Sequence, residues 1–81
     1  MIHELKTWQP YFEQVKSGLK TFELRENDRD FKIGDELLLK EYSASHDEFT
    51  GNFCHRRVDF ILHGGRFGLE DGFCILGLSK I

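Results

Sequence analysis

Short strand-like runs recur along this chain, and only one segment has the spacing of a helix. Each run is apolar or alternates between apolar and polar residues, and most are bounded by glycine, asparagine or aspartate. The predicted strands are Ile2–Thr7, Thr21–Arg25, Glu36–Tyr42, Phe53–Leu62 and Phe73–Ser79, with a polar hairpin loop over Ser43–Gly51. This pattern favours a mixed α/β, mainly β fold: a small, partly open barrel of five or six strands with one main short helix.

The predicted helix spans Pro10–Ser17. Proline suits the first helical position, because its missing N–H would have no partner there. Apolar side chains then recur at helical spacing, at Tyr11, Phe12, Val15 and Leu19. Gly18 is well placed to end the helix in the left-handed conformation.

With 81 residues, the chain is near the lower size limit for a domain that folds without staples. No repeat or linker divides it, so residues 1–81 are predicted to form a single domain, with any ligand in a surface cleft. No stretch approaches the roughly 20 apolar residues of a membrane span, and the first residues do not resemble a signal peptide. We therefore expect a cytoplasmic protein without a membrane partner.

Cys54 and Cys74 are too far apart to form a CxxC motif, and both lie in predicted strands. A buried thiol behaves there as a small apolar side chain, so buried thiols are the favoured interpretation. The four histidines show no metal-ligand spacing. We expect neither a metal nor a cofactor.

The formal net charge is −3, which argues against tight, nonspecific binding to a nucleic-acid backbone. Arg56, Arg57 and Arg66 could still form a local basic patch, although a solvated strand face is the more favoured interpretation. Trp8 is a candidate stacking platform for an unpaired base. The alternative is that it covers an edge of the core.

The most informative segment for function is Gly18–Arg25. Strand alternation places Thr21, Glu23 and Arg25 on one face, and Lys20 precedes the strand just after a glycine. These residues could bind a planar polar ligand such as a nucleobase, with Lys20 or Arg25 binding phosphate. The alternative is a surface ladder of charges with little effect. If the cleft exists, Glu23 should lie within salt-bridge reach of Lys20 or Arg25, because an unpaired buried carboxylate is costly.

The pattern G-x-K-T-x-E-x-R, followed by Asn27–Phe31 and Ile33–Asp35, resembles the hallmark of ASCH domains within the PUA-like superfamily. The opening His3–Lys6, Tyr11-Phe12 and the closing Gly72–Leu76 are similar to a compact branch of that group. The resemblance covers about Ile2 to Leu78. It implies a β-barrel with a cleft beside the helix and a role in RNA or nucleotide binding.

Some ASCH members are amidohydrolases that act on acetylated cytidine nucleosides, and their catalytic lysine corresponds to Lys20. Those enzymes have a threonine three positions later, where this sequence has Glu23. Their further glutamate lies in a helical insertion, for which Glu70 is the nearest candidate here. The resemblance therefore implies Lys20 and Glu23 as catalytic candidates, without a matching hydroxyl nucleophile.

Three hypotheses follow. The leading one is a binding module that holds RNA or a nucleotide-like small molecule at Lys20, Thr21, Glu23 and Arg25. The alternatives are a small amidohydrolase of acetylated cytidine nucleosides and a protein-interaction domain. Binding RNA would require the basic residues to gather on one side of the molecule.

Overall fold

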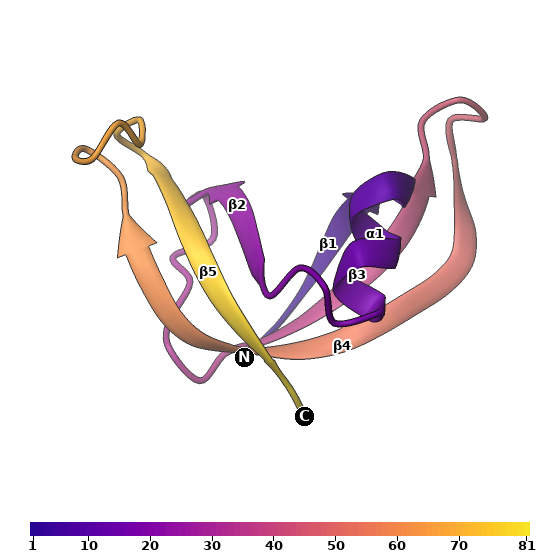
Figure 1. Cartoon of the computed structure of the whole chain (residues 1–81), viewed down its shortest axis with the longest axis horizontal. Coiled ribbons are helices and arrows are strands. Elements are labelled where there is room, and N and C mark those ends of the chain that lie inside the picture. The colour runs from indigo at the N-terminus through magenta and orange to yellow at the C-terminus, as the bar shows by residue number, and fades with distance from the viewer.

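The computed structural model describes all residues from Met1 to Ile81. The chain forms one curled sheet and one short helix (Figure 1), with the elements β1 (Ile2–Trp8), α1 (Gln9–Lys16), β2 (Phe22–Glu26), β3 (Glu36–Ser43), β4 (Glu48–His63) and β5 (Phe73–Lys80). The sheet order is β1-β3-β4-β5-β2. The β1–β3 pair is parallel and the other three pairs are antiparallel.

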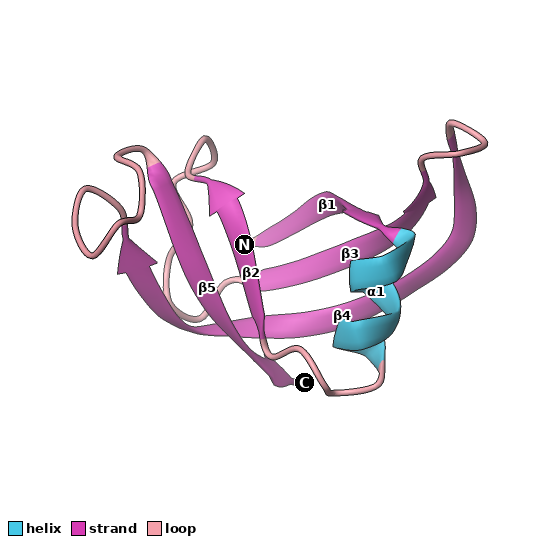
Figure 2. Ribbon diagram, turned by 45° about the horizontal axis from the view of Figure 1, so that its top comes forward, coloured by secondary structure: helices cyan, strands magenta, loops and turns pink.

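This sheet is an open half-barrel. Figure 2 shows the curled sheet, with α1 lying beside β1 and β3. Because β1 and β2 are the two ends of the strand order, each presents one unpaired edge. The predicted mainly β fold with one short helix is thus confirmed, as a curled five-strand sheet that does not close.

The curvature depends on β4, which serves both halves of the sheet. Its first part pairs with β3 and its second part pairs with β5. The β3–β4 register shifts between Lys40 and Tyr42, and the β4–β5 register shifts between Val58 and Phe60. Such irregularities bend a strand and increase its twist. The prediction of a hairpin loop over Ser43–Gly51 was wrong in extent, because strand pairing continues to Ser43 and resumes at Glu48.

The helix begins one residue earlier than predicted, after Trp8 at its N-cap. It buries Phe12 and Val15 against the sheet, while Tyr11 and Leu19 are exposed, contrary to the predicted apolar stripe. Gly18 follows the helix with a φ of 88°, as the sequence predicted. With eight residues, α1 is neither long nor apolar enough to cross a membrane.

The core lies inside the curled sheet, beneath the helix. Its buried apolar residues are Leu5, Phe12, Val15, Phe31, Leu37, Leu39, Cys54, Val58, Cys74, Leu76 and Leu78. Both cysteines are buried, as predicted, and burial raises the pKa of each thiol. They therefore behave as small core residues.

One polar pair is buried beside this core. His3 Nε2 lies 2.8 Å from Asp35 Oδ2, and the Lys32 N–H donates to the same oxygen at 3.0 Å. The His3 hydrogen bond is the main cause that holds the pKa of Asp35 below its ordinary value. The pair ties the start of β1 to the turn that precedes β3.

Candidate functional site

The largest cleft lies along the opening between the two sheet edges. It has a volume of about 690 Å³, and its lining comes from β1, α1, β2 and the connection that precedes β2. The lining residues are Lys6, Thr7, Trp8, Tyr11, Gln14, Leu19, Lys20, Phe22, Glu23, Leu24 and Arg25. Since no strand fills the opening between β1 and β2, the cleft is the seam that a closed barrel would lack.

A buried carboxylate is held between two cations in this cleft. Lys20 Nζ donates to Glu23 Oε1 at 3.0 Å, and Arg25 Nε donates to Glu23 Oε2 at 3.2 Å. Each carboxylate oxygen therefore has one charged partner, which offsets the cost of removing it from water. The prediction that Glu23 lies within salt-bridge reach of Lys20 or Arg25 is confirmed for both.

Two arginines connect β2 and the segment after it to the free edge of β1. Arg25 Nη2 donates to the Lys6 carbonyl at 2.6 Å, and Arg29 Nη1 donates to the Glu4 carbonyl at 2.7 Å. Alternate carbonyls of a strand face the same edge, and this edge of β1 has no partner strand. The guanidinium groups satisfy these acceptors and fix the position of Arg25 in the cleft.

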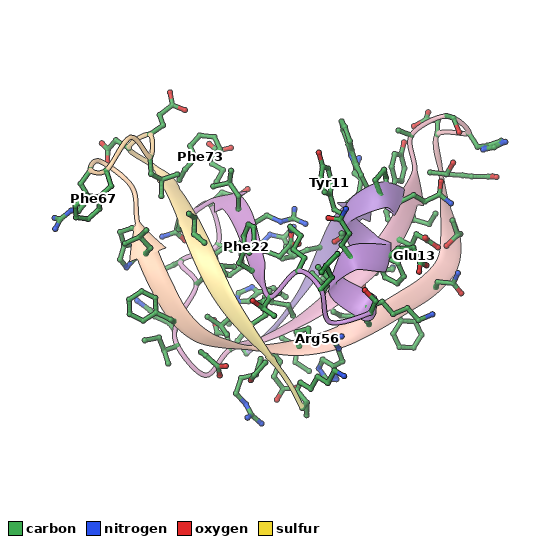
Figure 3. All side chains as sticks on the ribbon, viewed as in Figure 1. Tyr11, Glu13, Phe22, Arg56, Phe67 and Phe73 are labelled. Atoms are coloured by element: carbon green, nitrogen blue, oxygen red, sulfur yellow. The ribbon has the colours of Figure 1, made fainter.

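Aromatic rings stand at the mouth of the cleft. Lys20 Nζ lies 5.6 Å from the centre of the Tyr11 ring and 4.9 Å from that of Phe22. Figure 3 shows Tyr11 on α1 and Phe22 on β2, on opposite sides of the opening. Trp8 also lines the cleft and is largely exposed. The site therefore combines a charged floor with aromatic walls.

This arrangement is suited to binding a flat, polar molecule. Carboxylate oxygens can each accept more than one hydrogen bond, so Glu23 retains acceptor capacity beyond its two charged partners. Faces of aromatic rings stack on planar groups and attract cations. No group of three or more histidine, cysteine or carboxylate side chains is arranged to hold a metal ion.

The structure does not bring all the predicted site residues together. Thr21 precedes β2 and lines a separate pocket of about 250 Å³, which it shares with Arg56. Its carbonyl accepts a hydrogen bond from the Leu78 N–H at 2.9 Å, which continues the pairing of β2 with β5 by one residue, but Thr21 does not line the cleft. Glu70, the candidate for the further glutamate of the hydrolases, lies in the loop before β5 and outside the cleft.

The three arginines proposed as a basic patch point to different surroundings. Arg56 Nη2 donates to the Val15 carbonyl at 3.0 Å, so it caps the C-terminal end of α1. Arg57 is its neighbour on β4 and therefore lies on the opposite face of the strand. Arg66 directly precedes Phe67 in the loop between β4 and β5, and Figure 3 shows Phe67 far from Arg56. These residues do not form one surface.

Several cleft residues were not anticipated from the sequence. Thr7, Gln14 and Leu24 carried no recognisable signal, and Tyr11 and Leu19 were predicted as members of the apolar stripe of the helix. The signal that could have found Tyr11 is the width of the apolar stripe. The helix buries only Phe12 and Val15, fewer than the three to four residues per two turns that a typical amphipathic helix buries, so Tyr11 on the flank of the stripe is exposed.

Comparisons with known proteins place this chain in a family. The family described as "Domain of unknown function (DUF3850)" matches residues 2–78. The chain belongs to the DUF3850 family. It is also 39% identical over 57 residues to an uncharacterized 12.9 kDa protein in the GpA 3′ region of Escherichia phage P2, a match over 70% of the chain. The matched residues make up 50% of the phage protein, so the chain spans about half the length of this curated relative.

Proposed function

We propose that this DUF3850 domain is a binding module with a PUA-like fold of the ASCH kind, and that it holds RNA or a nucleotide-like ligand in the seam cleft. One observation carries the proposal. The buried Glu23 carboxylate lies between Lys20 and Arg25 at the floor of a cleft with aromatic walls. A nucleobase needs these features: faces on which to stack, and acceptors and donors that meet its polar edge.

Each group has a definite role in this proposal. A base enters the mouth and stacks on Tyr11 or Phe22, the rings beside Lys20. The amino groups of the base donate to the remaining lone pairs of Glu23. Lys20 and Arg25 provide the positive charge that attracts an attached phosphate. Because Arg25 also donates a hydrogen bond to a main-chain carbonyl of β1, its side chain is held in position before a ligand binds.

The same geometry favours binding over amide hydrolysis. Hydrolysis needs an activated nucleophile and a group that protonates the leaving amine. Lys20 and Glu23 are bonded to each other, and the Thr7 hydroxyl is buried and accepts a hydrogen bond from Arg25. No hydroxyl or thiol hydrogen-bonded to a general base lines the cleft, and Lys20 is engaged in an ion pair with Glu23.

The test is to titrate short single-stranded RNAs and the four ribonucleoside monophosphates into the protein at moderate salt, with binding measured by calorimetry. Lys20→Ala and Arg25→Ala should each weaken binding by about 1.5–3 kcal/mol, the range for hydrogen bonds to charged groups. Lys32→Ala and Arg57→Ala are matched controls, because both side chains are exposed and lie outside the cleft. Equal affinities of the wild type and both cleft variants would place the site elsewhere.

A further inference from the structure

A second group of aromatic and basic side chains lies on the outer face of the sheet. The inward residues of β1 and β3 are buried, so the alternate residues of these strands face outward. The strand register places outward residues of β1 and β3 beside residues of β4 in two adjacent rows, Trp8–Tyr42–Phe49 and Lys6–Lys40–Phe53. We name these six residues the outer platform.

Its members contact one another across the two rows. Lys6 Nζ lies 4.3 Å from the centre of the Tyr42 ring, and Lys40 Nζ lies 5.3 Å from that of Phe49. The Tyr42 and Phe49 rings meet edge to face, with centroids 5.2 Å apart. Phe49 and Phe53 nevertheless remain 50% and 61% exposed. The outer platform therefore offers exposed aromatic surface beside two ammonium groups.

The outer platform is continuous with the seam cleft. Trp8 and Lys6 belong to its β1 edge and also line the cleft. Neighbouring strands are about 4.8 Å apart, so each row extends roughly 10 Å from that edge across β3 to β4. A chain that leaves the cleft past Trp8 meets Tyr42 and then Phe49.

From this continuity we infer that the ligand is a single-stranded RNA whose next nucleotides lie on the outer platform; this inference rests on the proposed function of the cleft. Aromatic residues on a sheet surface stack on successive unpaired bases, with basic residues close to the phosphates. Charge complementarity supports the same occupant, because Lys6 and Lys40 are the charged members of the platform. Lys40 is also 3.4 Å from Glu4, but an exposed pair of this kind is weak and a phosphate can replace it.

The test compares one ligand that fills only the cleft with one that reaches the platform. The four ribonucleoside monophosphates and a mixed-sequence single-stranded RNA are titrated against the wild type, Phe49→Ala and Lys40→Ala. Phe49→Ala should weaken RNA binding roughly 5- to 150-fold, the range for loss of one stacked base. Lys40→Ala should reduce the slope of log affinity against log salt by about 0.7, the value for one phosphate contact on a single strand. Neither variant should change mononucleotide affinity.

Phe60→Ala is the matched control, because this ring is 60% exposed on the second part of β4, outside both the platform and the cleft. Mononucleotide binding with RNA affinity unchanged by Phe49→Ala and Lys40→Ala would overturn the platform and leave the cleft proposal standing. An equal loss in Phe60→Ala would overturn it too. Absence of mononucleotide binding, or binding unchanged by Lys20→Ala, would instead overturn the cleft proposal on which it rests.

Discussion

Replacing Glu23 by alanine removes the centre of the cleft floor, and the structure gives the size of the effect. The Glu23 side chain is 6% exposed, and its partners Lys20 and Arg25 are 16% and 24% exposed. Breaking a buried ion pair costs about 3–5 kcal/mol, because the remaining charge is left without a partner. Since both cations retain some contact with water, we expect the lower end, about 3 kcal/mol. A domain of this length has a free energy of unfolding of about 4–12 kcal/mol, so the loss is large.

The assay is urea unfolding, monitored by circular dichroism. A loss of about 3 kcal/mol should lower the midpoint by at least about 1 M, because m is about 1–3 kcal/mol/M for small domains. Glu23→Gln should give an intermediate loss, since the amide retains one acceptor. Glu13→Ala is the control: this carboxylate is exposed on α1, and surface changes stay within about 0.5 kcal/mol. Equal midpoints for Glu23→Ala and Glu13→Ala would refute the buried ion pair.

Three further predictions follow from other parts of the molecule. Asp35→Asn should lower the free energy of unfolding by about 1.5–3 kcal/mol at neutral pH, because the hydrogen bond with His3 involves a charged carboxylate. The pKa of Asp35 is lowered in the folded state. The ionised carboxylate therefore contributes fully to the free energy of unfolding above its ordinary pKa of 3.8, and this contribution is lost as the pH falls through the folded-state pKa. Urea unfolding of both proteins from pH 7 to 3 should therefore show the difference begin to shrink below about pH 4; a difference that stayed constant from pH 5 down to pH 3 would contradict this. Gly64→Ala should destabilise the domain by about 1–3 kcal/mol in thermal unfolding, because a Cβ there overlaps the Glu70 carbonyl oxygen, and an unchanged melting temperature would show that the loop is placed differently. The purified protein should leave acetylated cytidine intact in prolonged incubation at neutral pH, as monitored by chromatography, whereas turnover that Lys20→Ala abolishes would favour hydrolysis.

The sequence predicted the secondary structure more closely than it predicted which residues are buried. Strand alternation and the proline and glycine signals gave five strands and one helix within a few residues. The helix stripe was less informative: spacing places Tyr11, Phe12 and Val15 on one side of α1, whereas Leu19 lies beyond the end of the helix at Lys16. How much of that side is covered depends on the curvature of the sheet, which arises from register shifts in β4. Tyr11 and Leu19 lie beyond the covered part and line the cleft.

The cleft itself was predictable only in its centre. Alternation placed Glu23 and Arg25 on one face of β2, but it did not show that this charged face points inward while Phe22 is exposed. That inversion follows from tertiary structure: β2 is an edge strand at an open seam. Contacts between distant segments were equally hidden, such as the one between His3 and Asp35, which lie 32 residues apart.

The most direct test of the central claim is to map the ligand on the protein. Amide and indole signals of ¹⁵N-labelled protein are recorded by NMR during titration with the four ribonucleoside monophosphates. If the seam cleft binds the ligand, the largest changes occur at the Lys20 and Glu23 amides and at the Trp8 indole, and they saturate. Arg25→Ala should shift the whole titration to higher concentrations. Unchanged spectra at millimolar nucleotide, or changes centred on the outer face around Phe60, would contradict the account.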